Sequence, residues 1–136
     1  MQQIHITILN QNMSFNYNSV IANCLRKKDN SRSILYIKRF QEMTNSINAA
    51  LFMSQLLFWW GKGAKKGWIY KTINEIREET GLTKDQQRTA IRIWVEADIL
   101  ETKLWGVPPK RHFRINVDSL LEFLDIRDSL DEELQK

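Results

Sequence analysis

The segment after Thr83 carries polar and charged side chains that share the outside of one predicted helix. Arginine presents a fork of donors that fits two acceptors at once, lysine is a mobile point charge, and glutamine carries both a donor and an acceptor. In a major groove, Arg88 can donate to guanine O6 and N7, and Gln86 can pair with adenine N6 and N7. Near the helix start, Lys84 can reach a phosphate. The outward positions are Lys84, Asp85, Gln86, Arg88, Thr89 and Arg92.

Two other segments supply cations that suit contact with a phosphate backbone or a minor groove. The loop from Gly61 to Gly67 is glycine-rich and basic, but it lacks the GxxxxGK[ST] spacing of a P-loop and follows a predicted helix rather than a strand. The second segment is a turn containing Pro108 and Pro109, with the strands beside it. For each cation the alternative is an ordinary solvated surface charge. The candidate residues are Lys62, Lys65 and Lys66 in the loop and Lys103, Lys110, Arg111 and Arg114 around the turn.

The distribution of charge along the chain is uneven. The 136 residues carry a formal net charge of +4. Residues 1–59 have a net charge of +4, residues 60–114 one of +5, and residues 115–136 one of −5. This pattern describes a basic body with an acidic tail, and a basic face favours an anionic partner such as a nucleic acid.

Residues that could support catalysis, metal binding or a disulfide are scarce. Cys24 is the only cysteine, so no internal disulfide can form and a reducing, cytoplasmic setting is expected. His5 and His112 have no Ser/Asp or metal-ligand partners at a recognisable spacing, and no zinc motif is present. The most apolar run, residues 47–60, is shorter than the about 20 residues that a membrane-spanning helix needs. We therefore expect no enzyme activity, cofactor, metal site or membrane partner.

The first 44 residues predict short elements only. Ile4, Ile6 and Ile8 alternate with polar residues, which is typical of a strand. Residues 20–25 predict one or two helical turns, residues 33–37 a second strand, and residues 39–43 another helical turn. We expect residues 1–44 to form an N-terminal extension that packs on the body.

The pattern is clearer from about Asn45, where apolar residues at helical spacing predict a helix that ends at about Trp60 and lies centrally in the core. Residues 68–71 then predict a short strand. Residues 72–75 read Thr-Ile-Asn-Glu, a capping box that should open a helix running to about Thr80. Gly81 should end this helix in the left-handed conformation.

A second capping box, Thr83 to Gln86, follows the glycine and should open a helix that runs to about Ala97. Two short helices joined by a tight Gly-Leu turn are typical of a helix-turn-helix motif. The expected buried face of the second helix consists of Ala90, Ile91, Trp94 and Ala97, with Gln87 at its edge. Among the other tryptophans, Trp68 is expected in the core, and Trp60 and Trp105 are expected to be partly exposed.

Two strands, residues 99–105 and 111–117, are predicted on either side of the proline turn, and a hairpin directly after a helix-turn-helix is a wing. The predicted fold class is therefore α+β, mainly helical: a winged helix-turn-helix over residues 45–117. Residues 118–136 predict an acidic C-terminal helix. Its apolar stripe, which includes Leu120, Leu121 and Leu124, is either packed on the body or used for dimerisation or a partner.

Several of these blocks also occur in a known family. The chain contains SQLLFWW from Ser54, GWIYKT from Gly67, GLT from Gly81, and GVPP followed by FRIN from Gly106. In this order, residues 46–117 resemble the winged-helix domains of phage and plasmid replication proteins of the replisome-organiser or replication-initiator type. The resemblance implies a DNA-binding role in a mobile element.

Together these patterns predict a sequence-specific double-stranded DNA-binding protein of a phage or plasmid, acting in replication initiation or transcriptional regulation. The alternative is a winged-helix protein-interaction module that binds a replication, transcription or host-defence protein through its aromatic residues or its acidic tail. A homodimer that reads two half-sites is the natural way for a small domain to gain specificity.

Overall fold

The structure is a computed structural model and describes residues 16–60, 62 and 67–136. The chain divides into two compact units, Met1–Ser33 and Ile34–Lys136. In the first unit, helix α2 (Tyr17–Asp29) contains the helical turns predicted for residues 20–25 and extends beyond them. The strand predicted at Ile4 to Ile8 lies outside the described residues. Within the described ranges, no helix combines the length and the apolar character needed to cross a membrane.

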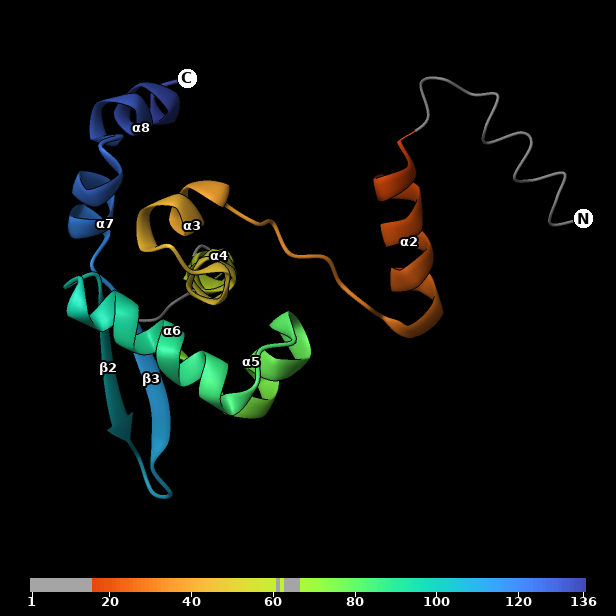
Figure 1. The fold of residues 1–136 in the computed structure, drawn as a ribbon, viewed down its shortest axis with the longest axis horizontal. Helices are drawn as coiled ribbons and strands as arrows, with labels where there is room; N and C mark the ends of the chain where they lie inside the picture. Colours follow the sequence, from red (N-terminus) through yellow and green to blue (C-terminus); the bar gives the residue numbers. More distant parts are fainter. Residues whose placement is uncertain (1–15, 61, 63–66) are drawn as a thin grey trace, which may run out of the picture. The chain divides into compact units, whose positions relative to one another are not determined.

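The second unit is α+β and mainly helical, which confirms the predicted class (Figure 1). Its three strands form an antiparallel sheet in the order β1-β3-β2. These strands are β1 (Ile69–Tyr70), β2 (Leu100–Trp105) and β3 (Lys110–Ile115). The helices described in this unit are α3 (Lys38–Thr44), α4 (Ile47–Trp60), α5 (Ile73–Thr80), α6 (Lys84–Glu96), α7 (Val117–Leu124) and α8 (Arg127–Leu134).

Residues 33–37 form no strand, so that prediction was wrong. The backbone N–H of Ile37 donates instead to the hydroxyl of Ser54 on α4, at 3.1 Å. β-branched residues favour a strand only where a neighbouring strand can pair with them. Helix α3 confirms the next predicted turn and buries Phe40, whose ring meets Trp94 edge-on with centroids 5.4 Å apart. Residues 34–44, expected in the N-terminal extension, therefore belong to the second unit.

Helix α4 is the core helix, as the sequence predicted. It begins at Ile47 rather than Asn45, because Asn45 is left-handed (φ 58°) and closes α3. The Ser46 hydroxyl then accepts the N–H of Ala49 at 3.1 Å and caps α4. Burial around most of its circumference fixes the positions of the surrounding elements. The buried residues of α4 are Ala49, Ala50, Phe52, Met53, Ser54 and Leu56.

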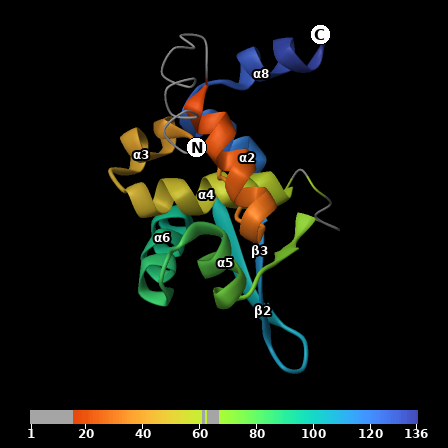
Figure 2. The same ribbon diagram turned by 90° about the vertical axis from the view of Figure 1, so that its right-hand side faces the viewer.

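The sheet packs one face on the core and ends in a hairpin. Phe113 of β3 is fully buried and meets the Phe52 ring edge-on at 5.5 Å. The β2–β3 hairpin projects past α5 and α6 in both views (Figures 1 and 2). Strand β3 is shorter than predicted: Val117 begins α7, because Asn116 accepts the N–H of Ser119 at 3.1 Å as a helix cap.

Helices α5 and α6 have the caps that the sequence predicted. Thr72 and Glu75 form the capping box of α5, and Thr83 and Gln86 form that of α6. Gly81 ends α5 with φ 80°, and Leu82 is buried directly after it. Local side-chain chemistry therefore sets where both helices begin and how the chain turns between them.

The turn between α5 and α6 yields a first testable result. Gly81→Ala should lower the free energy of unfolding by about 1–2 kcal/mol, the cost of holding an L-residue in the left-handed region. A Cβ at Gly81 meets nothing within 4 Å, so the penalty is purely a backbone one. Gly81→Asn should cost less, because asparagine adopts this conformation more easily. Urea unfolding measures both variants, and equal losses for Ala and Asn would contradict a backbone origin.

The acidic tail is not the single helix that the sequence predicted. It consists of α7 and α8, separated at Asp125, which is left-handed (φ 55°). Leu120 and Leu124 of α7 are buried in the core, whereas α8 buries none of its residues. The apolar stripe ends at Leu124 because the chain turns before it can continue. In both views α8 lies at the end of the unit opposite the hairpin tip (Figures 1 and 2).

Candidate nucleic-acid interface

The predicted outward positions of α6 are all exposed: Lys84, Asp85, Gln86, Arg88, Thr89 and Arg92. The Arg88 side chain is 72% exposed, and its nearest guanidinium nitrogen lies 3.9 Å from Asp85. An exposed pair at this distance contributes about 0–1 kcal/mol, so Arg88 can exchange Asp85 for an outside acceptor. Lys84 and Arg92 form no ion pair with another described residue. The face therefore presents three cations.

Gln86 is less available than the sequence analysis assumed. Its side-chain oxygen accepts the backbone N–H of Thr83 at 2.9 Å, and its own backbone N–H donates to the Thr83 hydroxyl at 3.2 Å. A bidentate contact with adenine needs both the oxygen and the nitrogen of the carboxamide. The capping box holds the oxygen against the Thr83 N–H, so to read adenine in this way Gln86 has to share or give up that hydrogen bond.

Gln87 is fully buried rather than at the edge of a face, which corrects the prediction. Its side-chain nitrogen donates to the carbonyl oxygens of Ile73 and Leu82, each at 3.0 Å. Its oxygen accepts from the guanidinium of Arg111 at 2.9 Å. A single amide thus joins α5, the turn, α6 and β3. In the sequence, only the helical spacing of Gln87 from the buried Ala90 indicated burial. A polar side chain such as that of glutamine is more often exposed, so burial was not predicted.

Arg111 was predicted to contact DNA from the wing tip, and the structure turns it inward instead. Besides its bond to Gln87, its guanidinium lies over the Phe113 ring at 4.9 Å. Its Nε is buried without a hydrogen-bond partner among the described residues. Burial lowers the pKa of Arg111, but a guanidinium remains cationic in proteins. Its position holds β3 against α6, so its main contribution is structural.

The other predicted hairpin cations lie on one face of the sheet, beside aromatic rings. The Lys103 ammonium is 4.0 Å from the Trp68 ring centroid, and Arg114 covers the same ring at 4.8 Å. Lys110 lies 5.1 Å from the Tyr70 ring. Trp68 is only half-buried, so its predicted core position was wrong, because the side chain points to the solvent face of the sheet.

The glycine-rich loop is described only in part. Lys62 is exposed and lies over the Phe58 ring at 5.2 Å, so it stands near the end of α4. Lys65 and Lys66, the two other predicted phosphate contacts of this loop, lie outside the described residues.

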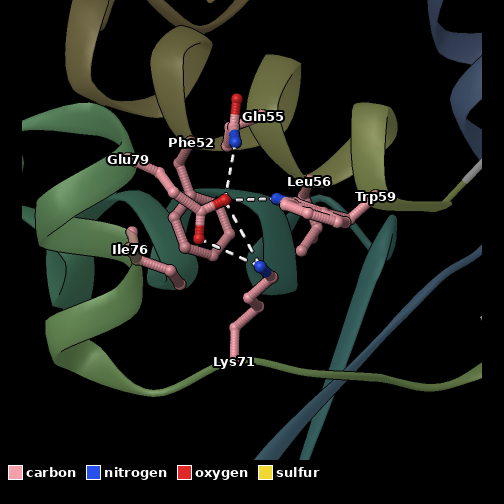
Figure 3. A pocket seen from close by; sticks show the side chains of 7 residues that line it. All are labelled: Phe52, Gln55, Leu56, Trp59, Lys71, Ile76 and Glu79. Atoms are coloured by element: carbon pink, nitrogen blue, oxygen red, sulfur yellow. Dashed lines mark hydrogen bonds and ion pairs between the residues drawn. The ribbon is translucent and has the colours of Figure 1, made fainter. Parts of the chain in front are cut away.

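The structure also contains a polar cluster that the sequence analysis missed, centred on Glu79 of α5. Figure 3 shows its carboxylate accepting from the Gln55 amide at 2.7 Å, from the Trp59 indole N–H, and from the Lys71 ammonium at 3.0 Å. The Lys71 ammonium also lies 3.5 Å from the centroid of the Trp59 ring. The cavity beside this cluster measures about 10 Å³, space for about one water molecule. The cluster therefore holds together α4, α5 and the segment just after β1 that carries Lys71, and it leaves no space for a ligand larger than water.

The described residues show no group of three or more His, Cys, Asp or Glu side chains that could hold a metal ion. Cys24 is exposed on α2 and forms no disulfide.

No family model, curated protein or solved structure matches the chain. The family resemblance of residues 46–117 remains a prediction from the sequence.

Proposed function

We propose that residues 45–117 form a winged helix that binds double-stranded DNA, with α6 in the major groove and the β2–β3 hairpin as the wing. The observation that carries the proposal is the exposed face of α6. Lys84, Arg88 and Arg92 are spaced by four residues, so with 3.6 residues per turn they lie along one side of the helix. The α5 helix and its tight turn support that face from behind.

The chemistry of the α6 face suits a groove. Arg88 has the donor geometry for guanine, and Asp85 beside it can accept from the N4 amine of cytosine. Lys84 stands at the first residue of α6, where the positive end of the helix dipole favours a phosphate. Arg92 lies two turns further along and suits the opposite backbone.

The surroundings of α6 also support the proposal. The hairpin projects past α5 and α6 and carries Lys110 next to its turn (Figure 1). Helix α8, which belongs to the acidic tail, lies at the end of the unit opposite the hairpin tip in both views (Figures 1 and 2). The proposed biological role, taken from the resemblance, is replication initiation or transcriptional regulation in a phage or plasmid. A homodimer reading two half-sites and a cytoplasmic location belong to the same proposal.

One observation favours a second candidate function. Helix α8 buries no residue, and Leu134 is 75% exposed among carboxylates. A basic protein with a small apolar cleft fits such a helix. Under this alternative the chain is a protein-interaction module, and the α6 cations are ordinary solvated charges.

A titration of duplex DNA against salt tests the proposal. With about six phosphates neutralised, the slope of log K against log salt should be roughly −5. Arg88→Ala with Arg92→Ala should lower duplex affinity about tenfold or more, since removing one arginine that binds a base costs about 1–3 kcal/mol. The control is Lys38→Ala with Arg39→Ala, which removes the same charge from exposed positions on α3. Equal losses of affinity for the two pairs, or no binding at low salt, would contradict a duplex interface on α6.

A further inference from the structure

The solvent face of the sheet gathers the aromatic and basic residues of three strands. Side chains alternate along a strand, and residues paired across neighbouring strands share a face. His112 of β3 is opposite Tyr70 of β1 and Lys103 of β2, and Lys110 is opposite Trp105. We call this surface the outer sheet face: Trp68, Tyr70, Glu101, Lys103, Trp105, Lys110, His112 and Arg114.

The aromatic rings on the outer sheet face are accessible. Trp105 is 65% exposed and Tyr70 is 40% exposed. The His112 ring lies between them, 5.5 Å from the Tyr70 ring and 5.6 Å from the Trp105 ring. The hydrophobic core lies on the opposite face, where Phe113 is buried. A row of three rings, supported by the sheet, therefore faces solvent.

Cations are interleaved with these rings. The Lys103 ammonium lies 4.0 Å from the Trp68 ring and 5.0 Å from the Trp105 ring. Lys110 covers Tyr70 at 5.1 Å. The one carboxylate of the face, Glu101, is already paired with Arg114 at 2.6 Å. The net charge of the face is positive, and its two lysines have no carboxylate partner among the described residues.

We propose that the outer sheet face binds single-stranded DNA, with unpaired bases stacked on Trp105 and Tyr70 and phosphates held by Lys103 and Lys110. Rings and cations in alternation are what a strand of stacked bases on a charged backbone requires. A duplex keeps the flat faces of its bases inside the stack, so exposed rings gain little from it. Unpaired bases offer those faces freely.

This surface is separate from the α6 face. Its residues come from the three strands and the segment just before β1, and none of them lies on α6. The inference that the outer sheet face binds a single strand therefore does not depend on the α6 proposal. The choice of DNA over RNA rests on the proposed function. If both proposals hold, one chain contacts a duplex through α6 and the wing and an unpaired strand through the outer sheet face, with Lys110 common to both surfaces.

The test measures binding of the full chain to four labelled probes at low salt: oligo(dT), an abasic deoxyribose-phosphate strand of equal length, oligo(U) and a duplex. Tyr70→Ala with Trp105→Ala should lower affinity for oligo(dT) by about 30-fold or more, the lower end of the range for the loss of two stacked bases. It should leave duplex affinity within about twofold, because this variant keeps the α6 cations and Lys110 of the wing, which are the proposed duplex contacts. Binding of oligo(dT) should also quench tryptophan fluorescence, and Trp105→Ala should reduce that quenching.

Two control variants sharpen the result. Leu104 is the neighbour of Trp105 on the opposite face of β2 and is 73% exposed, so Leu104→Ala removes a similarly exposed side chain without touching the outer sheet face. It should leave oligo(dT) affinity unchanged, and Trp105→Phe should retain most of it because phenylalanine can still stack. Both positions are exposed, so neither variant should affect folding.

Several outcomes would overturn the inference. These are equal affinity for oligo(dT) and the abasic strand, an equal loss of affinity for Leu104→Ala, or a parallel loss of duplex binding in the aromatic variant. Tighter binding of oligo(U) than of oligo(dT) would overturn the assignment to DNA. Failure of the duplex proposal is seen separately, as duplex affinity that Arg88→Ala with Arg92→Ala leaves unchanged.

Discussion

Replacing Trp94 by alanine should lower the free energy of unfolding by about 3–5 kcal/mol, the range for truncating a fully buried large aromatic side chain. Trp94 is 0% exposed and packs edge-on against Phe40 and Phe123. Its indole N–H also donates to the Ala49 carbonyl oxygen at 2.9 Å. Total stabilities of single domains are about 5–15 kcal/mol, so this loss is a large fraction of the whole. The proposed recognition helix would lose its main attachment to α4.

A second substitution at the same position separates packing from hydrogen bonding. Trp94→Phe keeps an aromatic ring in the pocket but removes the N–H, so it should cost clearly less than Trp94→Ala. Urea unfolding followed by far-UV circular dichroism measures both variants. An equal loss for Phe and Ala would show that the hydrogen bond to Ala49, rather than the packed ring, dominates. Arg92→Ala is the matched surface control on the same helix and should change stability by no more than about 0.5 kcal/mol.

Glu79→Leu should lower the free energy of unfolding by about 3 kcal/mol, because it removes the nearer carboxylate of a largely buried lysine and leaves only the more exposed Glu75, 4.0 Å from the Lys71 ammonium. The Lys71 side chain is only 10% exposed, and Glu79 is its partner at 3.0 Å. The Gln55 amide and the Trp59 indole N–H would lose the same acceptor. Three donors would then be left facing an apolar side chain.

A double-mutant cycle identifies the cause of this loss. Lys71→Met in the Glu79→Leu background should restore part of the stability, because no unpaired charge remains in the cluster. Glu78 is the exposed neighbour of Glu79 on α5, and Glu78→Leu is the matched control. Independent, additive losses for Lys71→Met and Glu79→Leu would contradict a coupled ion pair.

Expectations that depend on residues a few positions apart agreed with the structure. The capping boxes at Thr72 and Thr83 and the left-handed Gly81 each involve groups within four residues of one another. Such interactions have few alternatives, so the residue types specify them directly. Helical spacing also predicted that Arg88 and Arg92 are exposed on α6, because it places them on a different side of the helix from the buried Trp94.

Predictions for side chains or segments whose interactions depend on residues elsewhere in the fold were less accurate. Gln86 was assigned both to a cap and to a base, although its carboxamide oxygen already accepts the Thr83 N–H. Arg111 follows Lys110 in β3, so its side chain points to the opposite face of the sheet. The sequence does not reveal that Gln87 of α6 lies within hydrogen-bond distance on that face. The strand expected at residues 33–37 lacked a neighbouring strand. In each case the missing information was the identity of a distant partner.

By itself, the sequence determined the helix boundaries near α5 and α6, the turn between them and the cations that leave α6, because these depend on short-range hydrogen bonds and helical periodicity. Only the tertiary structure decided that Glu79 meets Lys71 and Trp59, and that the His112 ring lies between those of Tyr70 and Trp105. Those groupings follow from strand register and helix packing, which join residues that are distant in the sequence. The pairing of β1 with β3 and the packing of α5 on α4 join distant segments, so a local pattern of residue types does not reveal them.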